Sequence, residues 1–179
     1  MIIHNPENIS LGSDIWIFAY SVLTAGPRKE ASHVFGASQK VHNQSTRSGG
    51  ASLVIGNEVQ IGLYNVLNAT AGLSIGDRVT LSARVSIYSS THIANDPDDP
   101  GRRVGANGMT KSIPVFSKAR VISIGEGAWL GLNVSVVCAS IGAHCFVKSG
   151  SIVSKDQPMN SVVAGQPAVV LGERYSVND

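Results

Sequence analysis

The residues best suited to chemistry gather around one histidine, His92. It lies where a regular apolar pattern ends and a long polar segment begins. An imidazole has an ordinary pKa of about 6.5, so it can take a proton from a bound group near neutral pH. The segment that follows carries amide, carboxylate and guanidinium groups: Asn95, Asp96, Asp98, Asp99, Arg102 and Arg103. Such groups can bind several hydroxyls of one ligand, but Asn, Asp, Pro and Gly also form ordinary solvated turns, and both interpretations stay open.

The other reactive side chains give weaker signals. Cys138 and Cys145 do not form a CxxC pair, and two cysteines do not make a disulfide framework, so we expect two buried thiols in a reducing compartment. No serine or cysteine with a fixed base partner is evident, so no covalent intermediate is required. We expect the remaining histidines to be surface or loop residues: His4, His33, His42 and His144.

Composition excludes several classes of protein. Of 179 residues, 43% are apolar and only 15% are charged, which excludes a disordered chain. Val and Ile together number 36 and Leu only 10, which favours strands over a helical bundle. The net charge of +2 without runs of like charge argues against nucleic acid as a partner. No apolar run is long enough to insert into a membrane, and the N-terminus lacks the features of a secretion signal, so we expect a cytoplasmic protein.

An aliphatic residue recurs every six positions, often followed by Gly or another small residue. Five runs share this period, and their members are Leu11, Ile17, Leu23; Ile55, Ile61, Leu67; Ile75, Leu81, Ile87, Ile93; Ile124, Leu130, Val136; and Ile141, Val147, Val153. Period six is not helical, but it suits short strands joined by tight corners. An antiparallel sandwich would place its turns every 8–12 residues instead.

Three such strands close a triangular coil of 18 residues with the recurring aliphatic side chain inside. The sequence therefore predicts an all-β prism of about five coils, stacked roughly 4.8 Å apart, as one domain over residues 1–179. Residues 1–25 are predicted to form a further coil. Two segments lack the period and are expected to be long extruded loops, at about 26–54 and 94–123.

Four local motifs accompany the hexads, and together they are specific. These are Thr91-His92 before the second loop, Trp129-Leu130-Gly131, Ser154-Lys155-Asp156, and the AGQPA sequence at 164–168. With these motifs, residues 53–171 resemble the hexapeptide-repeat acetyltransferases, and most of all the galactoside/maltose and polysaccharide O-acetyltransferases.

The resemblance implies a left-handed parallel β-helix, a homotrimer, and acetyl-coenzyme A bound between subunits, with no metal required. It implies that His92 is catalytic and that Asn65, which follows an aromatic residue as in the family, orients the acceptor hydroxyl. A plain turn asparagine is the alternative for Asn65. Asp96 and Tyr88 are expected to bind the acceptor, with Asp96 also able to orient the imidazole. Coenzyme A contacts are expected at Trp129, Gly131, Ser149, Ser154 and Lys155.

The function so implied is acetyl-coenzyme A-dependent O-acetylation of a hydroxyl on a sugar or polysaccharide precursor. The acceptor would be a small molecule or a lipid- or nucleotide-linked sugar. His92 would take the acceptor proton, and the oxygen would attack the thioester directly, without an acyl-enzyme. Two alternatives remain: N-acetylation of an amino sugar or small amine, including antibiotic-type acceptors, and a non-catalytic binding trimer. A γ-type carbonic anhydrase is disfavoured because His92 and His144 have no third histidine in a repeat to complete a zinc site.

Overall fold

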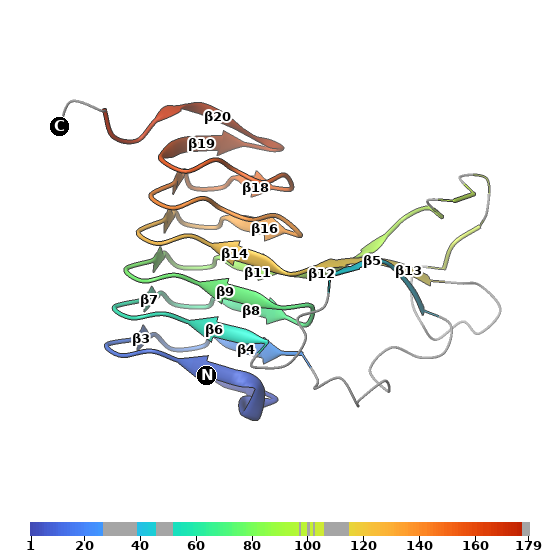
Figure 1. The fold of residues 1–179 in the computed structure, drawn as a ribbon, viewed down its shortest axis with the longest axis horizontal. Helices are drawn as coiled ribbons and strands as arrows, with labels where there is room; N and C mark the ends of the chain where they lie inside the picture. The colour runs from blue at the N-terminus through green and yellow to red at the C-terminus, as the bar shows by residue number, and fades with distance from the viewer. Residues whose placement is uncertain are drawn as a thin grey trace.

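The protein is a three-sided prism of stacked coils with one arm projecting from its side (Figure 1). A computed structural model describes residues 1–26, 39–45, 52–96, 98–99, 101, 103–105 and 115–176, with the backbone alone for 39–45. Apart from one 3-10 turn at Pro6–Asn8, every regular element in these ranges is a strand.

Three sheets form the three sides of the prism. Face A contains β1 (Ile2–His4), β4 (Val22–Ala25), β8 (Val66–Ala69), β11 (Ser86–Tyr88), β16 (Ser135–Val137) and β18 (Ile152–Val153). Face B contains β2 (Ile9–Leu11), β6 (Leu53–Ile55), β9 (Leu73–Ile75) and β14 (Ile122–Ile124). Face C contains β3 (Trp16–Ile17), β7 (Gln60–Ile61), β10 (Thr80–Leu81), β15 (Trp129–Leu130), β17 (Phe146–Val147), β19 (Ser161–Gly165) and β20 (Ala168–Glu173).

Neighbouring strands within a face are parallel, because the chain returns to each face once per coil. On face A, Leu23 pairs with Leu67, Leu67 with Ile87, and Ile87 with Val136. Among the described strands of the three faces, only β20 runs antiparallel, to β19, at the C-terminal end. The predicted all-β fold of about five coils is confirmed, and residues 1–25 do form a further coil through β2, β3 and β4.

The hexad side chains fill the interior. Leu67, Leu81 and Leu130 have no exposed surface, and most other members of the five runs are equally buried. Leu11 is an exception at 54% exposure, because β2 is the edge strand of face B and no coil packs beneath it. Ile17 is only partly buried for the same reason, since β3 is the edge strand of face C. Ile93 is a third exception: the chain has left the prism there, so the residue lies in a strand of the arm rather than in the core.

Glycines at the corners let successive coils approach closely. At Gly125 an added Cβ would lie 2.4 Å from the backbone nitrogen of Ala143, in the coil above. No side-chain movement can relieve contact with a backbone atom, so this corner needs a residue without a Cβ. The Ile-Gly pairs of the sequence therefore mark an inward side chain followed by a contact between coils.

The arm joins the two segments expected to be loops. Its sheet has the order β12 (Ser90–Ile93), β13 (Val115–Arg120) and β5 (Gln39–Ser45). Strand β13 pairs antiparallel with β12 and parallel with β5, so each segment contributes a strand to one sheet. Figure 1 shows the arm leaving the prism at the edge where faces A and B meet, between the third and fourth coils. Arg102, predicted beside His92, lies outside the described residues.

Candidate active site

His92 lies on β12, at the root of the arm, with its side chain exposed. It is the direct cross-strand partner of Ser117 on β13. The imidazole Nδ1 lies 3.1 Å from the Ser117 hydroxyl oxygen, a hydrogen-bonding distance. Within the described part of the chain no other group hydrogen-bonds the ring, so Nε2 is available to a bound molecule.

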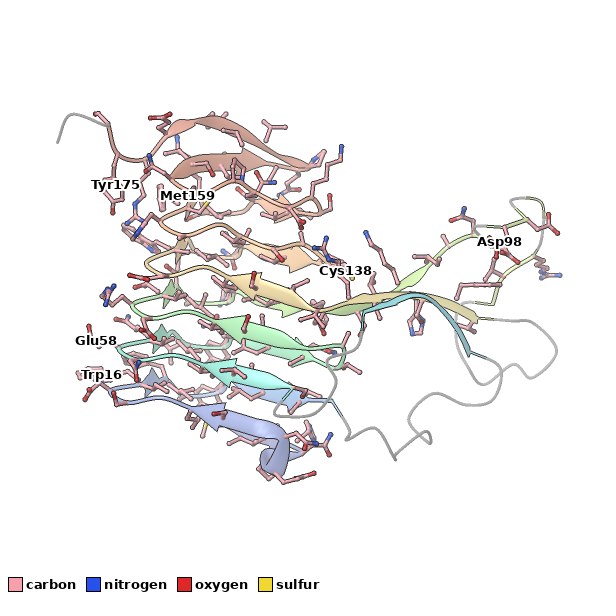
Figure 2. All side chains as sticks on the ribbon, viewed as in Figure 1. Trp16, Glu58, Asp98, Cys138, Met159 and Tyr175 are labelled. Atoms are coloured by element: carbon pink, nitrogen blue, oxygen red, sulfur yellow. The ribbon has the colours of Figure 1, made fainter. Side chains whose placement is uncertain are left out.

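The residues predicted to bind the acceptor flank His92 on either side in sequence. Tyr88 ends β11 on face A, half-buried between Asn68 and Val137 of the adjacent coils. Asp96 is buried, and its Oδ1 accepts a hydrogen bond of 3.0 Å from the backbone N–H of Asp98. Asp96 therefore shapes the turn beyond β12, while Asp98 lies further out along the arm (Figure 2).

Within one chain, Asn65 does not lie beside His92. It precedes β8, at the corner of faces C and A, whereas His92 follows β11 at the opposite end of face A. Its side chain is fully buried, and Oδ1 accepts a hydrogen bond of 2.6 Å from the backbone N–H of Val85 in the next coil. Among the described residues its Nδ2 has no hydrogen-bond partner. This geometry favours the alternative interpretation of Asn65 as a corner residue that links two coils.

Three of the predicted coenzyme A residues lie together on or beside face C. Trp129 is 44% exposed, donates from Nε1 to the Ser82 hydroxyl at 3.2 Å, and packs against Phe146 with ring centroids 4.9 Å apart. Gly131 and Ser149 are in contact: an added Cβ on Gly131 would lie 2.7 Å from Ser149 Oγ, which accepts the Leu132 N–H at 3.1 Å. Trp129 and Ser149 are exposed there, and Gly131 is buried between the coils.

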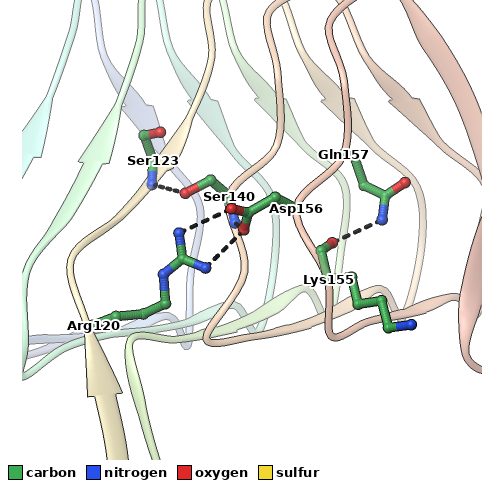
Figure 3. A network of polar contacts seen from close by, with 6 residues as sticks. All are labelled: Arg120, Ser123, Ser140, Lys155, Asp156 and Gln157. Carbon is green, nitrogen blue, oxygen red and sulfur yellow. Dashed lines mark hydrogen bonds and ion pairs between the residues drawn. The ribbon is translucent and has the colours of Figure 1, made fainter. Parts of the chain in front are cut away.

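The other two lie at the opposite edge of face A. Ser154 and Lys155 follow β18 and are both exposed. The Lys155 carbonyl accepts a hydrogen bond of 2.7 Å from Gln157 Nε2, which fixes the turn and leaves the ammonium group to solvent (Figure 3). Within one chain, the predicted coenzyme A residues therefore lie in two separate sets. His92 is on the same side of face A as Ser154 and Lys155.

A contact that the sequence did not predict holds the arm to the upper coils. Arg120, the last residue of β13, makes two hydrogen bonds of 3.0 Å to the carboxylate of Asp156 (Figure 3). The same carboxylate accepts the Ser140 N–H at 2.8 Å. Burial alone would raise the pKa of Asp156, but the Ser140 and Arg120 hydrogen bonds outweigh it and lower that pKa. Asp156 belongs to the Ser-Lys-Asp motif, but nothing in the sequence pairs it with Arg120, 36 positions away.

Replacing Arg120 with Ala is expected to loosen the root of the arm. Exposed ion pairs contribute about 0.5–1 kcal/mol, so β13 amides should exchange hydrogen roughly two- to fivefold faster. The pKa of Asp156 is lowered in the fold. The Arg120–Asp156 ion pair therefore stabilises the folded state fully at pH values above the unfolded pKa of 3.8, and this stabilisation is lost as the pH falls through the folded pKa. The protection of β13 by this pair should therefore persist from neutral pH down to about pH 5.

Hydrogen exchange followed by mass spectrometry measures this effect. Arg78→Ala is the matched control, because it removes another surface ion pair, with Glu126, on the prism. Equal exchange of β13 in the two variants would mean that Arg120 does not anchor the arm.

Neither cysteine is placed to act as a nucleophile. Both are free and buried. Burial raises the pKa of the Cys138 thiol, only partly offset by the charges of Lys118 and Arg120. Cys145 Sγ lies 2.7 Å from the Ser161 hydroxyl, inside the prism.

The described residues contain no group of three His, Cys, Asp or Glu side chains that could hold a metal ion. No helix among them could span a membrane.

The sequence is related to acetyltransferases, although no family model matches it. The galactoside O-acetyltransferase of Escherichia coli is 32% identical over 108 residues, which are 60% of this chain and 45% of that protein. Serine acetyltransferase 4 of Arabidopsis thaliana is 32% identical over 114 residues, 63% of this chain and 27% of that protein. The chain thus spans less than half the length of these two relatives.

Solved acyltransferase structures share the fold. AntD, an N-acyltransferase from Bacillus cereus crystallised with dTDP and 3-hydroxybutyryl-CoA, superposes with a TM-score of 0.70 at 18% identity, covering 97% of this chain and 77% of that one. These comparisons confirm the resemblance: the protein is a left-handed parallel β-helix, and its sequence relatives are acetyltransferases.

Proposed function

We propose that the protein is an acetyl-coenzyme A-dependent O-acetyltransferase that modifies a sugar hydroxyl with His92 as general base. The observation that carries this proposal is the state of the imidazole. It is exposed at the root of a polar arm, and its Nδ1 is engaged by Ser117, which leaves Nε2 to face a substrate. The acetyltransferase relatives support the class of reaction.

The reaction proceeds by direct transfer. His92 Nε2 takes the proton of the acceptor hydroxyl as its oxygen bonds to the thioester carbonyl carbon. The tetrahedral intermediate collapses with breakage of the carbon–sulfur bond, and the imidazolium returns the proton to the departing coenzyme A thiolate. A covalent acetyl-enzyme is not needed, and both cysteine thiols are buried and so unsuited to form one.

The active enzyme is a homotrimer with acetyl-coenzyme A held between subunits. In one chain the Trp129, Gly131 and Ser149 surface lies across face A from His92, Ser154 and Lys155. Figure 2 shows the arm projecting away from its own prism, on the side opposite Trp16. A second subunit that receives the arm would bring the two sets of residues to one donor molecule. Lys155 would then meet a coenzyme A phosphate as a point charge.

The acceptor is a small, lipid-linked or nucleotide-linked sugar. Tyr88 and the polar turn at Asp96 flank His92 in sequence, and Asp98 and Asp99 follow on the arm. Hydroxyl-rich ligands suit such a surface of carboxylates and backbone amides. The protein acts in the cytoplasm, where its two unpaired thiols remain reduced.

A screen for coenzyme A release tests the proposed function. The purified protein is incubated with acetyl-coenzyme A and, separately, simple sugars, nucleotide sugars, amino sugars and small amines, and free thiol is measured. Release with hydroxyl sugars supports the proposal, release with amines alone supports N-acetylation, and no release with any acceptor favours a non-catalytic binding trimer. Light scattering on the same sample should give a trimer, and a monomer at micromolar concentration would contradict the shared donor site.

A further inference from the structure

The catalytic histidine is held from one side by a serine on a neighbouring strand. Ser117 Oγ lies 3.1 Å from His92 Nδ1, and the two residues are direct cross-strand partners. Ser117 is only 3% exposed. Strand β13 is the middle strand of the arm, because Ser117 pairs with Val41 of β5 on its other side. The backbone at Ser117 is therefore held by strand pairing on both sides.

We propose that Ser117 is a positioning residue that fixes the orientation and tautomer of the His92 imidazole. The inference rests on the proposed role of His92 as the base. A base must present an unprotonated nitrogen to the acceptor, so the ring proton must be on the other nitrogen. A proton on Nδ1, donated to Ser117 Oγ, meets this requirement and leaves the Nε2 lone pair directed outward.

The same contact serves both protonation states of the ring. When Nε2 takes the acceptor proton, both ring nitrogens become donors, and Nδ1–H continues to donate to Ser117 Oγ. Neither the ring nor the serine has to move during the transfer. If the hydroxyl instead donated to Nδ1, Nε2 would carry the proton and could not accept another. A base that acts through Nε2 therefore requires the tautomer in which Nδ1–H donates to Ser117 Oγ, and the 3.1 Å contact can accommodate it.

The burial of Ser117 favours a positioning role over a role as nucleophile. A serine beside a histidine can also attack an acyl group, but its oxygen must then touch the thioester carbon. With 3% of its surface exposed, Ser117 offers almost no surface to a bound thioester. It therefore acts on the reaction through His92 and forms no acetyl ester of its own.

The test combines an NMR readout that needs no turnover with steady-state kinetics. Nitrogen-15 histidine labelling reports the tautomer of His92, whose signal is identified by its loss in His92→Ala. Wild type should show the proton on Nδ1, and Ser117→Ala should shift the ring toward a mixture of tautomers. Loss of one hydrogen bond to the base should lower kcat about tenfold with KM for acetyl-coenzyme A within about twofold. Ser117→Thr should keep both properties, as should Ser123→Ala, an exposed serine on β14.

Two results would overturn the proposed role of Ser117. An unchanged tautomer and unchanged kcat in Ser117→Ala would overturn the inference. So would an acetyl group found on Ser117 by mass spectrometry of the enzyme mixed with acetyl-coenzyme A, because that would make it a nucleophile. If wild type transfers no acetyl group to any acceptor, the proposed function fails, yet the NMR comparison still shows whether Ser117 sets the state of His92.

Discussion

Replacement of His92 with Ala should lower kcat by 100-fold or more, while the coils remain folded. Without the imidazole, the acceptor hydroxyl has no group to take its proton as it attacks, and general bases of this kind contribute about 10²–10⁴ in rate. The side chain is exposed, and the one hydrogen bond it makes in the described chain is to Ser117, so its removal disturbs no core packing. Coenzyme A release with the best acceptor of the screen measures the change.

His4 provides the matched control for this experiment. It is an exposed histidine on β1, at the far end of face A from the arm, and His4→Ala should retain wild-type turnover. Circular dichroism and light scattering should show all three proteins with the same fold and assembly. Near-normal turnover in a folded His92→Ala protein would place the base elsewhere.

Replacement of Gly125 with Ala should lower the thermal stability of the protein substantially. The new Cβ would lie 2.4 Å from the backbone nitrogen of Ala143, so two coils must separate at that corner. Overpacking of this kind costs about 1–3 kcal/mol, which corresponds to a fall in Tm of roughly 3–10 °C for a chain of this size. Differential scanning calorimetry at constant protein concentration measures it.

Gly172→Ala is the control, because an added Cβ there meets nothing within 4 Å. Gly172 lies on the exposed terminal strand β20, and the substitution should leave Tm within about one degree of wild type. Equal melting temperatures for the two variants would mean that the Ile-Gly corners are not as tightly packed as the structure requires.

The coil architecture could be predicted because its determinants are local. Each hexad places one aliphatic residue inward and one small residue at the corner, and adjacent coils repeat the pattern, as Ile55-Gly56 and Ile75-Gly76 do. The exceptions occur where a hexad has no neighbouring coil to pack against. Leu11 and Ile17 lie in the first coil, at the edges of faces B and C, and Ile93 keeps the six-residue spacing after the chain has turned out into the arm.

The arm could not be predicted because its pairing is not local. Strands β5 and β13 are separated by about 70 positions, neither has the hexad period, and their association depends on backbone hydrogen bonds that any residues can make. The described parts of both segments depart from the coils except at their last residues, where β6 begins at Leu53 and β14 begins at Ile122. What the sequence did not show is that they meet in one sheet with β12.

The difference between local patterns and non-local contacts also decides which site residues could be predicted. His92 could be singled out from its position between the last hexad and a polar segment. Ser117 and Arg120 could not, because their partners lie 25 and 36 positions away and meet them only through the arm. Asn65 satisfied a family pattern in the sequence, yet its side chain points into the prism to bind the Val85 N–H, which periodicity alone cannot distinguish from an outward orientation.

The most direct test of the account is the chemical nature of the acetylated product. Wild type is incubated with carbon-13 acetyl-coenzyme A and the acceptor that gives the fastest thiol release, and the product is examined by NMR before and after treatment with hydroxylamine. We expect an acetyl ester on a sugar oxygen, cleaved by hydroxylamine and formed at least 100-fold more slowly by His92→Ala. A hydroxylamine-resistant acetyl amide, or no labelled product with any acceptor, would contradict it.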